Sequence, residues 1–362
     1  MNSNVAVLTF IVAALAFAPY GVSAHELNPD IIERIIEERP QEKTKQETNV
    51  DPRGEERTFA SFPEWYIVYS AQEYADFTAK DGRPSQFPYF ATTGQYWDSV
   101  TYTRAALGTT TLDSNTNTVL RFIGASFSFE NTVIGVYEKT IGRLTEELNG
   151  KHKTSEDQYT DKVAREYGDF LTHTPWYQFP YGQKLVGLWK TYGWSSLTPR
   201  GIERRAVFTV GYALKGLYAL VMGKLSQASL GTAQLTTSFV SEHVARDALA
   251  VMPSIEIVEE FPDGHIAAKA PRYRAFKGTV EQIARAGGSF QEIQGNDQIM
   301  VTIVAEAGTT CIRDRKDVIF AMPILSSAAM SRYALRVPVT GLTTVVRELD
   351  ECGVVFEHVY DY

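Results

Sequence analysis

Ten charged and aromatic residues are the candidates for a ligand-binding site in this sequence. Tyrosine and tryptophan rings beside a few carboxylates and cations suit a cleft for a lipid, a sugar or an aromatic molecule. The same rings at helical spacing also fill contacts between packed helices, and we favour this second interpretation. The candidate ligand-binding residues are Glu64, Trp65, Tyr66, Tyr69, Tyr96, Trp97, Asp98, Arg104, Trp176 and Lys215.

Familiar catalytic motifs are absent from the chain. The sequence contains no GxSxG, HExxH, SxxK, Walker A, GxGxxG or EF-hand pattern. The six histidines are scattered, with no pair three or four residues apart, so no metal site is indicated. The absence of these motifs argues against an enzyme. It does not exclude one, because an active site can be assembled from residues far apart in the sequence. We expect no cofactor, and the formal net charge of -8 argues against nucleic acid as a partner.

The chain has two cysteines, Cys311 and Cys352, and no CxxC motif. In an oxidising compartment they could form a disulfide within the C-terminal part of the protein. The distance that a disulfide requires is narrow, and cysteine is among the residues most often buried as a free thiol. We therefore favour two separate buried thiols over a disulfide.

The N-terminus has the pattern of an export signal. An uncharged apolar run extends from Val5 to Ala18, which is shorter than the roughly twenty residues that a spanning helix needs. The small residues at 22–24 match a cleavage site and would leave His25 as the mature N-terminus. The first four residues carry no basic side chain, so an uncleaved membrane anchor is the alternative for residues 1–24. Residues 25–57 form an acidic arm or linker, whose composition favours outward translocation.

An aromatic helix over residues 59–77 is the predicted anchor of the fold. Ser61 followed by Glu64 is a capping-box pattern, and Pro63 suits a first helical turn. Aromatic residues then recur at near-helical spacing, so the helix should bury much of its aromatic surface. Gly82 supplies the signal for its C-terminus.

Further helices are expected throughout residues 58–252, which we interpret as an aromatic-rich, mainly helical domain. An apolar periodicity predicts a long helix over residues 118–148, and Thr154 with Asp157 caps the next one. Two prolines between Thr174 and Tyr181 interrupt the helical pattern. The predicted helical segments are 85–108, 118–148, 154–173 and 198–225.

The most apolar of these segments is 206–222, which is interrupted by Lys215 and flanked by Arg204, Arg205 and Lys224. Three interpretations compete. A buried helix is favoured, with Lys215 on its polar edge. An in-plane amphipathic helix would direct the basic flanks at anionic headgroups. A spanning helix ranks last, because the run is short and a central lysine costs about 2.5 to 3.5 kcal/mol.

Residues 253–362 have a different pattern, with short strands and two helices. Two helix-strand units resemble each other at an offset of 66 residues, so that Phe276 aligns with Leu342 and Phe290 with Phe356. A βαβ-βαβ repeat indicates a ferredoxin-like α+β domain. We place the domain boundary between Met252 and Pro262, and the fold class of the whole chain is α+β. The strand candidates are 265–269, 290–294, 298–305, 317–321, 332–337 and 354–360.

Two short segments resemble a family of uncharacterised bacterial exported or membrane-associated proteins. They are FPEWYIVY at 62–69 and PRYRAF at 271–276. In that family a similar FPEW-aromatic-IVY block precedes a helical region and a C-terminal α/β module. The likeness extends from about Thr58 to about Ile293. The family has no established activity, so the resemblance implies an envelope location and the two-part layout and assigns no functional residue.

These observations lead to an expected function of a broad kind. We expect a non-enzymatic protein of the cell envelope, in the periplasm or on the periplasmic face of the inner membrane, that binds a partner protein or lipid. The alternative is an enzyme or small-molecule binder with its pocket between the helical and α+β domains.

Overall fold

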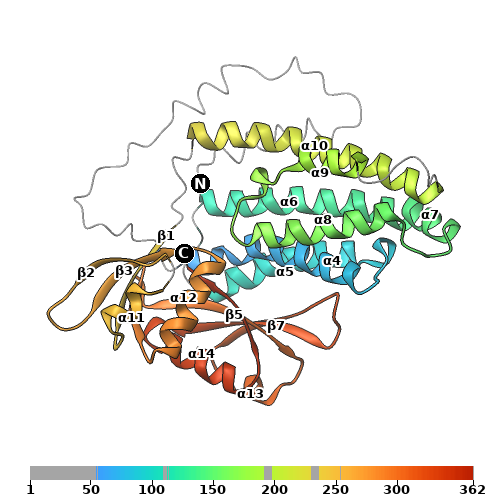
Figure 1. Ribbon diagram of the computed structural model, residues 1–362. Helices are drawn as coiled ribbons and strands as arrows, with labels where there is room; N and C mark the ends of the chain where they lie inside the picture. The colour runs from blue at the N-terminus through green and yellow to red at the C-terminus, as the bar shows by residue number, and fades with distance from the viewer. Residues whose placement is uncertain are drawn as a thin grey trace.

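The computed structural model describes residue 54 and residues 56–108, 112, 114–190, 198–229, 236–252 and 254–361. The predicted leader and almost all of the acidic arm lie outside the described residues. The chain is α+β, as predicted, with a helical region followed by two four-stranded antiparallel sheets and interspersed helices (Figure 1). Figure 1 shows the helical region on one side of the molecule and the two sheets, with their interspersed helices, on the other.

The helical region begins at Glu56 and is built largely of long helices. The capping box predicted for α8 is confirmed, because Thr154 and Asp157 exchange side-chain-to-backbone hydrogen bonds. Three short 3₁₀ or π turns join the helices: η1 (Pro84–Gln86), η2 (Glu138–Gly142) and η3 (Trp176–Gln178). The helices are α3 (Glu56–Ala60), α4 (Phe62–Ala79), α5 (Tyr89–Leu107), α6 (Ser114–Tyr137), α7 (Arg143–Leu148), α8 (Ser155–Leu171), α9 (Tyr181–Lys190) and α10 (Pro199–Ser229).

The start of the aromatic helix α4 differs from the prediction. Ser61 has helical backbone angles and makes no capping hydrogen bond, so the predicted capping box is wrong. The reason is that α3 runs almost directly into α4: the Ser61 amide donates to the Arg57 carbonyl, and the Trp65 amide donates to the Ser61 carbonyl. With its amides already satisfied, the helix needs no side-chain cap. At the other end the Gly82 amide donates to the Phe77 carbonyl, which closes the helix close to the predicted position.

Two sheets follow the helices, and the same strand order recurs in both. The first sheet has the order β2-β3-β1-β4 and the second the order β6-β7-β5-β8. The first contains β1 (Thr236–Glu242), β2 (Glu256–Glu260), β3 (Ile266–Pro271) and β4 (Ser289–Ile293), with α11 (Arg246–Ala250) and α12 (Arg274–Arg285). The second contains β5 (Gln298–Glu306), β6 (Val318–Pro323), β7 (Met330–Pro338) and β8 (Val355–Tyr360), with α13 (Thr310–Arg313), η4 (Val339–Gly341) and α14 (Leu342–Glu351).

The six predicted strands correspond to β3 through β8, whereas β1 and β2 were missed. Two sheets therefore stand where the sequence pattern indicated one, and β1 lies within the range 58–252 that was expected to be helical. Every second residue of β1 faces inward, and the three buried side chains are those of Thr237, Phe239 and Ser241. Because two of these three side chains are polar, the apolar alternation that marks a half-buried strand is broken. Strand β2 is an edge strand of mostly exposed residues.

The repeat at 66 residues corresponds to α12–β4 in one sheet unit and α14–β8 in the other. Phe276 and Leu342 occupy matching positions on the two helices, and Phe290 and Phe356 on the two strands. All four side chains are buried in one apolar core that includes residues of both sheets.

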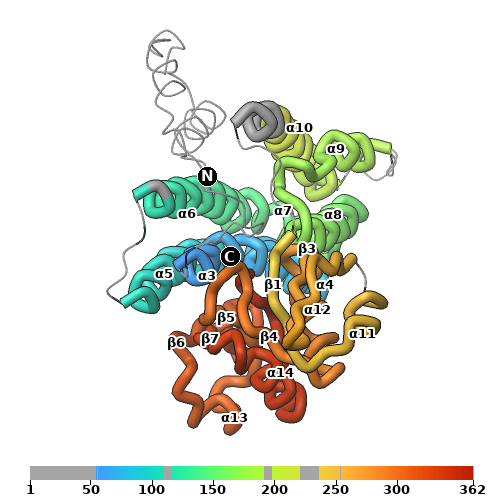
Figure 2. The backbone as a smooth tube through the Cα atoms, turned by 90° about the vertical axis from the view of Figure 1, so that its left-hand side faces the viewer, coloured from blue at the N-terminus to red at the C-terminus, as the bar shows by residue number. Residues whose placement is uncertain are grey.

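Helix α4 joins the helical region to the second sheet. Its Phe62 ring packs against Phe320 of β6 at a centroid distance of 4.8 Å. Further along the helix, Glu73 pairs with the buried Arg332 of β7 at 3.2 Å. The second sheet is therefore covered on one face by α4 and α5 and on the other by α12 and α14 (Figure 2).

The two cysteines form a disulfide, so the favoured interpretation of two separate thiols is wrong. Cys311 on α13 and Cys352 at the end of α14 have their sulfur atoms 2.08 Å apart. The short helix α13 brings the first cysteine to the C-terminus of α14, with a Cα–Cα distance of 6.5 Å, which lies within the range that a disulfide bridges. No linear pattern could show that these two helix ends meet.

Candidate functional site

The predicted binding residues on α4 are packed against other parts of the protein. The Trp65 ring lies 3.6 Å from the His358 ring on β8. The Tyr66 hydroxyl donates to Gln95 Oε1 on α5 at 3.0 Å. The Tyr69 hydroxyl is 2.8 Å from that of Tyr360. These three aromatic residues therefore hold α4 to α5 and to the second sheet. Glu64 is exposed on the same helix.

The candidates on α5 mostly contact α6. Tyr96 is buried and donates to the Leu120 carbonyl at 2.7 Å. The Trp97 indole donates to the Ser128 hydroxyl at 3.0 Å. Arg104 donates to the Asn117 side chain at 2.6 Å, and Asp98 is exposed. These contacts fill the helix-helix interface.

Trp176 contacts α10, and Lys215, which lies on α10, contacts α6. The Trp176 ring packs on Tyr218 of α10 with centroids 4.8 Å apart. Lys215 lies 2.5 Å from Glu130 of α6, so it pairs with a carboxylate rather than facing solvent at a polar edge. Burial disfavours the charged amine, but the Glu130 carboxylate holds the pKa of Lys215 above its usual value.

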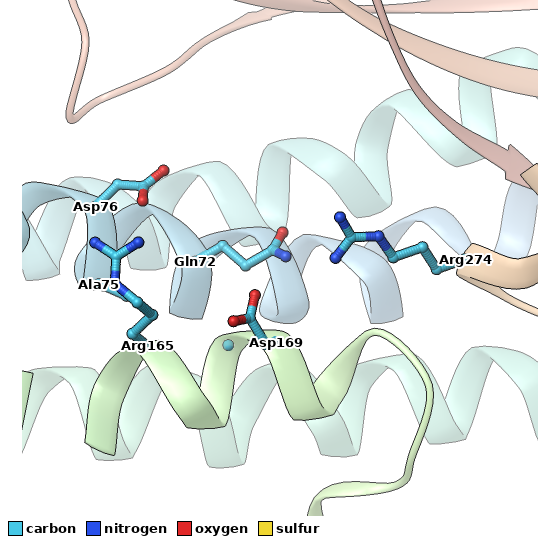
Figure 3. Close-up of a pocket in the computed structure, with 7 residues that line it drawn as sticks. Gln72, Ala75, Asp76, Arg165, Asp169 and Arg274 are labelled. Carbon is cyan, nitrogen blue, oxygen red and sulfur yellow. The ribbon is translucent and has the colours of Figure 1, made fainter. Parts of the chain in front are cut away.

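The ten candidates therefore lie in several helix contacts rather than around one cavity. Neither of two surface pockets in the described part of the chain is lined by any of the ten. The first pocket has a volume of about 220 Å³ and lies between α4, α8 and the start of α12. Figure 3 shows its polar side chains, two guanidinium groups and two carboxylates with one amide between them. They are Gln72, Asp76, Arg165, Asp169 and Arg274. This mixed charge suits a small dipolar molecule.

A buried ion network that the sequence did not reveal fixes α10 to α6, α7 and α8. Arg200 pairs with Asp157 at 2.8 Å and Arg205 with Glu156 at 2.7 Å. Arg204 is fully buried and forms a two-pronged pair with Glu138, at 2.8 and 3.0 Å. The interfacial alternative directed Arg204 and Arg205 at lipid headgroups as basic flanks. This part of the alternative is wrong, because both side chains face the protein interior.

The protonation equilibria of this network reflect its burial. Desolvation raises the pKa of Glu138, against the opposing effect of Arg204. Burial acts in the same direction on Glu203, but hydrogen bonds from Arg204 and Tyr137 hold the pKa of that carboxyl below its usual value. The sequence did contain a signal for this ion network, namely acidic residues within otherwise apolar helical stripes. A carboxylate that is buried in this way needs a cation as its partner.

The outward face of α10 is apolar, so the favoured interpretation of a wholly buried helix is incomplete. Every exposed residue from 202 to 220 on this helix is an alanine, valine, leucine or isoleucine. Val210, Leu217 and Leu220 are 58%, 61% and 67% exposed. We call this face the α10 stripe; it consists of Ile202, Ala206, Val210, Ala213, Leu217 and Leu220.

Helical geometry directs the α10 stripe away from the protein. Lys215 lies two residues from Ala213 and from Leu217, about half a turn around the helix. Since Lys215 reaches Glu130 of α6, the stripe faces the opposite way. Among the described residues, no helix is long and apolar enough to cross a membrane.

A second exposed apolar face runs along α6, η2 and α7. Its residues are between 44% and 64% exposed. Glu138, two residues after Val136, is buried against Arg204, so this face also points away from the interior. We call it the α6 stripe; it consists of Phe129, Val133, Val136, Ile141, Leu144 and Leu148. Both stripes belong to helices on the side of the molecule away from the sheets (Figures 1 and 2).

Comparison with known proteins gives no match to a family model, to a curated protein or to a solved structure. The resemblance carried by the FPEWYIVY block stays a prediction. Within the described part of the chain, no group of three or more histidine, cysteine or acidic side chains is arranged to hold a metal ion.

Proposed function

We propose that this chain is an exported, non-enzymatic protein that docks on the periplasmic face of a membrane through the α10 and α6 stripes. The observation that carries the proposal is the α10 stripe, where no charged side chain is exposed between Ile202 and Leu220. Exposed apolar patches of this extent on a folded protein mark an interaction surface. A helix with one apolar face outward and its charges inward fits a position in the plane of the lipid interface.

The size of the two stripes supports reversible docking rather than permanent anchoring. Half-burying a valine, leucine, isoleucine or phenylalanine contributes roughly 1 kcal/mol, so the larger side chains of both stripes supply about 5 to 10 kcal/mol before the cost of immobilisation. This range is comparable to one acyl chain, which binds membranes weakly and reversibly.

The export part of the proposal is supported by two independent features. One is the leader pattern at residues 1–24. The other is the Cys311–Cys352 disulfide, since such bonds persist mainly in oxidising compartments such as the periplasm.

We also infer that each sheet unit is a ferredoxin-like domain. Each unit has the chain order β-α-β-β-α-β, if the short helices α11 and α13 are counted. The order β2-β3-β1-β4 of the first sheet, repeated in the second, supports this assignment, as does the antiparallel pairing of all neighbouring strands.

Vesicle co-sedimentation of the exported chain, beginning at His25, tests the docking proposal. The double substitution Val210→Glu with Leu217→Glu should reduce binding to phosphatidylcholine vesicles at least tenfold, because each charge would have to enter the apolar part of the interface. Val251, 82% exposed beside the first sheet, provides the matched control, and Val251→Glu should leave binding unchanged. Equal binding of the parent and the double variant would exclude the α10 stripe as the docking surface.

The alternative, a small-molecule binder, is favoured by the pocket between α4, α8 and α12. Arg165 and Arg274 reach this pocket from the helical region and from the first sheet unit, respectively. A metabolite that raises the melting temperature of the parent chain but not that of Arg165→Gln would favour this second function.

A further inference from the structure

We propose that the edge of the α6 stripe selects membranes that contain anionic phospholipid headgroups, through Arg121, Lys139 and Arg143. We call these three residues the basic rim. The inference rests on the proposed docking function and adds the lipid class to it. All three side chains are exposed.

The basic rim keeps its positive charge because the carboxylates of α6, η2 and α7 pair with other cations. Between Ser114 and Leu148 the described acidic residues are Glu130, Glu138, Glu146 and Glu147. Glu130 pairs with Lys215, and Glu138 is buried against Arg204. Glu146 is buried against Arg200, and the exposed Glu147 pairs with Arg83 and Lys151. Among the described residues, no carboxylate forms an ion pair with the basic rim. The hydrogen bond of Lys139 to the Ser85 carbonyl is long, at 3.5 Å, and leaves its charge unneutralised.

The basic rim forms a row along one edge of the α6 stripe. Arg121 and Lys139 are eighteen residues apart, about five turns, so they share an edge of the helix, and Arg143 follows one turn later. Glu130 and Tyr137 face α10, where they meet Lys215 and Glu203. Arg121 and Lys139 lie about half a turn around from these two residues. The rim therefore borders the apolar surface on the side away from α10.

This position fits side chains that carry charge at the level of phosphate groups. When an apolar stripe enters the lipid interface, lysine and arginine at its edge extend their stems along the apolar surface and place their charged ends at the headgroups. Each such residue strengthens binding to an anionic membrane about fivefold, so three contribute roughly 100-fold.

The charge distribution of the whole molecule supports the same orientation. The whole chain carries a formal net charge of -8, whereas the basic rim is a row of positive charges. The edge strand β2 presents Glu256, Glu259 and Glu260, all exposed, on the sheet side of the molecule. Figure 1 places β2 and α6 on opposite sides. An anionic surface would therefore attract the α6 side and repel the sheet side.

Co-sedimentation with two kinds of vesicle tests the inference. The parent chain from His25 should bind vesicles containing phosphatidylglycerol much more tightly than vesicles of phosphatidylcholine alone, and high salt should reduce the difference. The triple variant Arg121→Gln, Lys139→Gln, Arg143→Gln should lose roughly 100-fold on the anionic vesicles and keep its binding to neutral ones.

The matched control removes the same charge elsewhere. Arg285, Arg313 and Lys316 are exposed in the sheet units, and their triple glutamine variant should retain the preference of the parent. An unchanged preference in the rim variant, or an equal loss in the control, would overturn the inference and leave the docking proposal standing. If the parent binds neither kind of vesicle, the docking proposal is wrong and the inference goes with it.

Discussion

The side chain of His358 on β8 has unusual surroundings. It is buried between the rings of Trp65 and Tyr360, and its Nε2 has no hydrogen-bond partner in the described part of the chain. Burial, with a smaller contribution from Lys277, lowers the pKa of His358 to about 3. The neutral imidazole thus serves as an aromatic spacer between α4 and the second sheet.

His358 should make the protein less stable in mild acid. The unfolded chain binds a proton at this residue near pH 6.5, whereas the folded chain does not until about pH 3. The unfolded state therefore holds more protons in this window, and the free energy of unfolding should fall by about 1.4 kcal/mol per pH unit below 6.5. Urea unfolding at pH 7, 6, 5 and 4 would measure this slope.

The variant His358→Phe isolates the effect. Phenylalanine keeps the ring beside Trp65 and removes the unpaired nitrogen, so stability at pH 7 should be equal or slightly higher. Buried carboxylates such as Glu138 contribute equally to both proteins. The difference between the two slopes therefore reports on His358 alone, and parallel slopes would disprove the assignment.

At the scale of elements, the disulfide compensates for a short and weakly anchored helix. Helix α13 has four residues, and only Ile312 among them is buried. The bond ties this helix to the end of α14 and closes a loop across a separation of 41 residues. Cross-linking a loop of this length restricts the unfolded chain.

Reduction of this bond should lower the free energy of unfolding by about 2 to 4 kcal/mol. Thermal unfolding with and without dithiothreitol measures the effect. The double variant Cys311→Ser with Cys352→Ser should match the reduced parent and should not respond to reductant. If the reductant shifts the double variant as well, the effect has another origin.

The sequence predicted elements well where a single periodicity governs them. The apolar repeat located most of α6 and α7 and the helix-strand units at 274–293 and 342–360. Sequence periodicity could not predict the contacts between segments that are far apart in the chain. Arg204 and Arg205 resemble the basic flank of an interfacial helix in the sequence, and only the packing of α10 against η2 and α8 shows that their partners are Glu138 and Glu156. Trp65 and Tyr69 on α4 likewise have their partners, His358 and Tyr360, on β8, nearly three hundred residues later.

At the scale of the whole molecule, the helical region and the second sheet form one body. Trp65 and Tyr69 on α4 share a core with Met300, Met322 and Ala334 of the sheet. Without α4, this apolar face of the sheet would be exposed to water, at a cost that the remaining sheet-helix contacts would have to offset.

The two regions should therefore unfold together. All five tryptophans precede residue 236, so their fluorescence reports on the helical region and, through Trp65 beside His358, on its contact with the second sheet. Circular dichroism reports on both. We expect a single denaturant midpoint by the two probes. Two separated midpoints would show that the sheets remain folded after α4 has left them.

The repeated strand order has a consequence for how this chain can change over generations. In a symmetric homodimer, one substitution alters both copies of a surface at once. Two units with the same strand order within one polypeptide are free of this constraint, and here their outer faces differ. The face of the second unit carries Met300 and Tyr360 and is sealed by α4, whereas the first has the half-buried polar residues Ser238, Lys269 and Glu292. Mutation of the first unit can therefore create new contacts while the second preserves the fold.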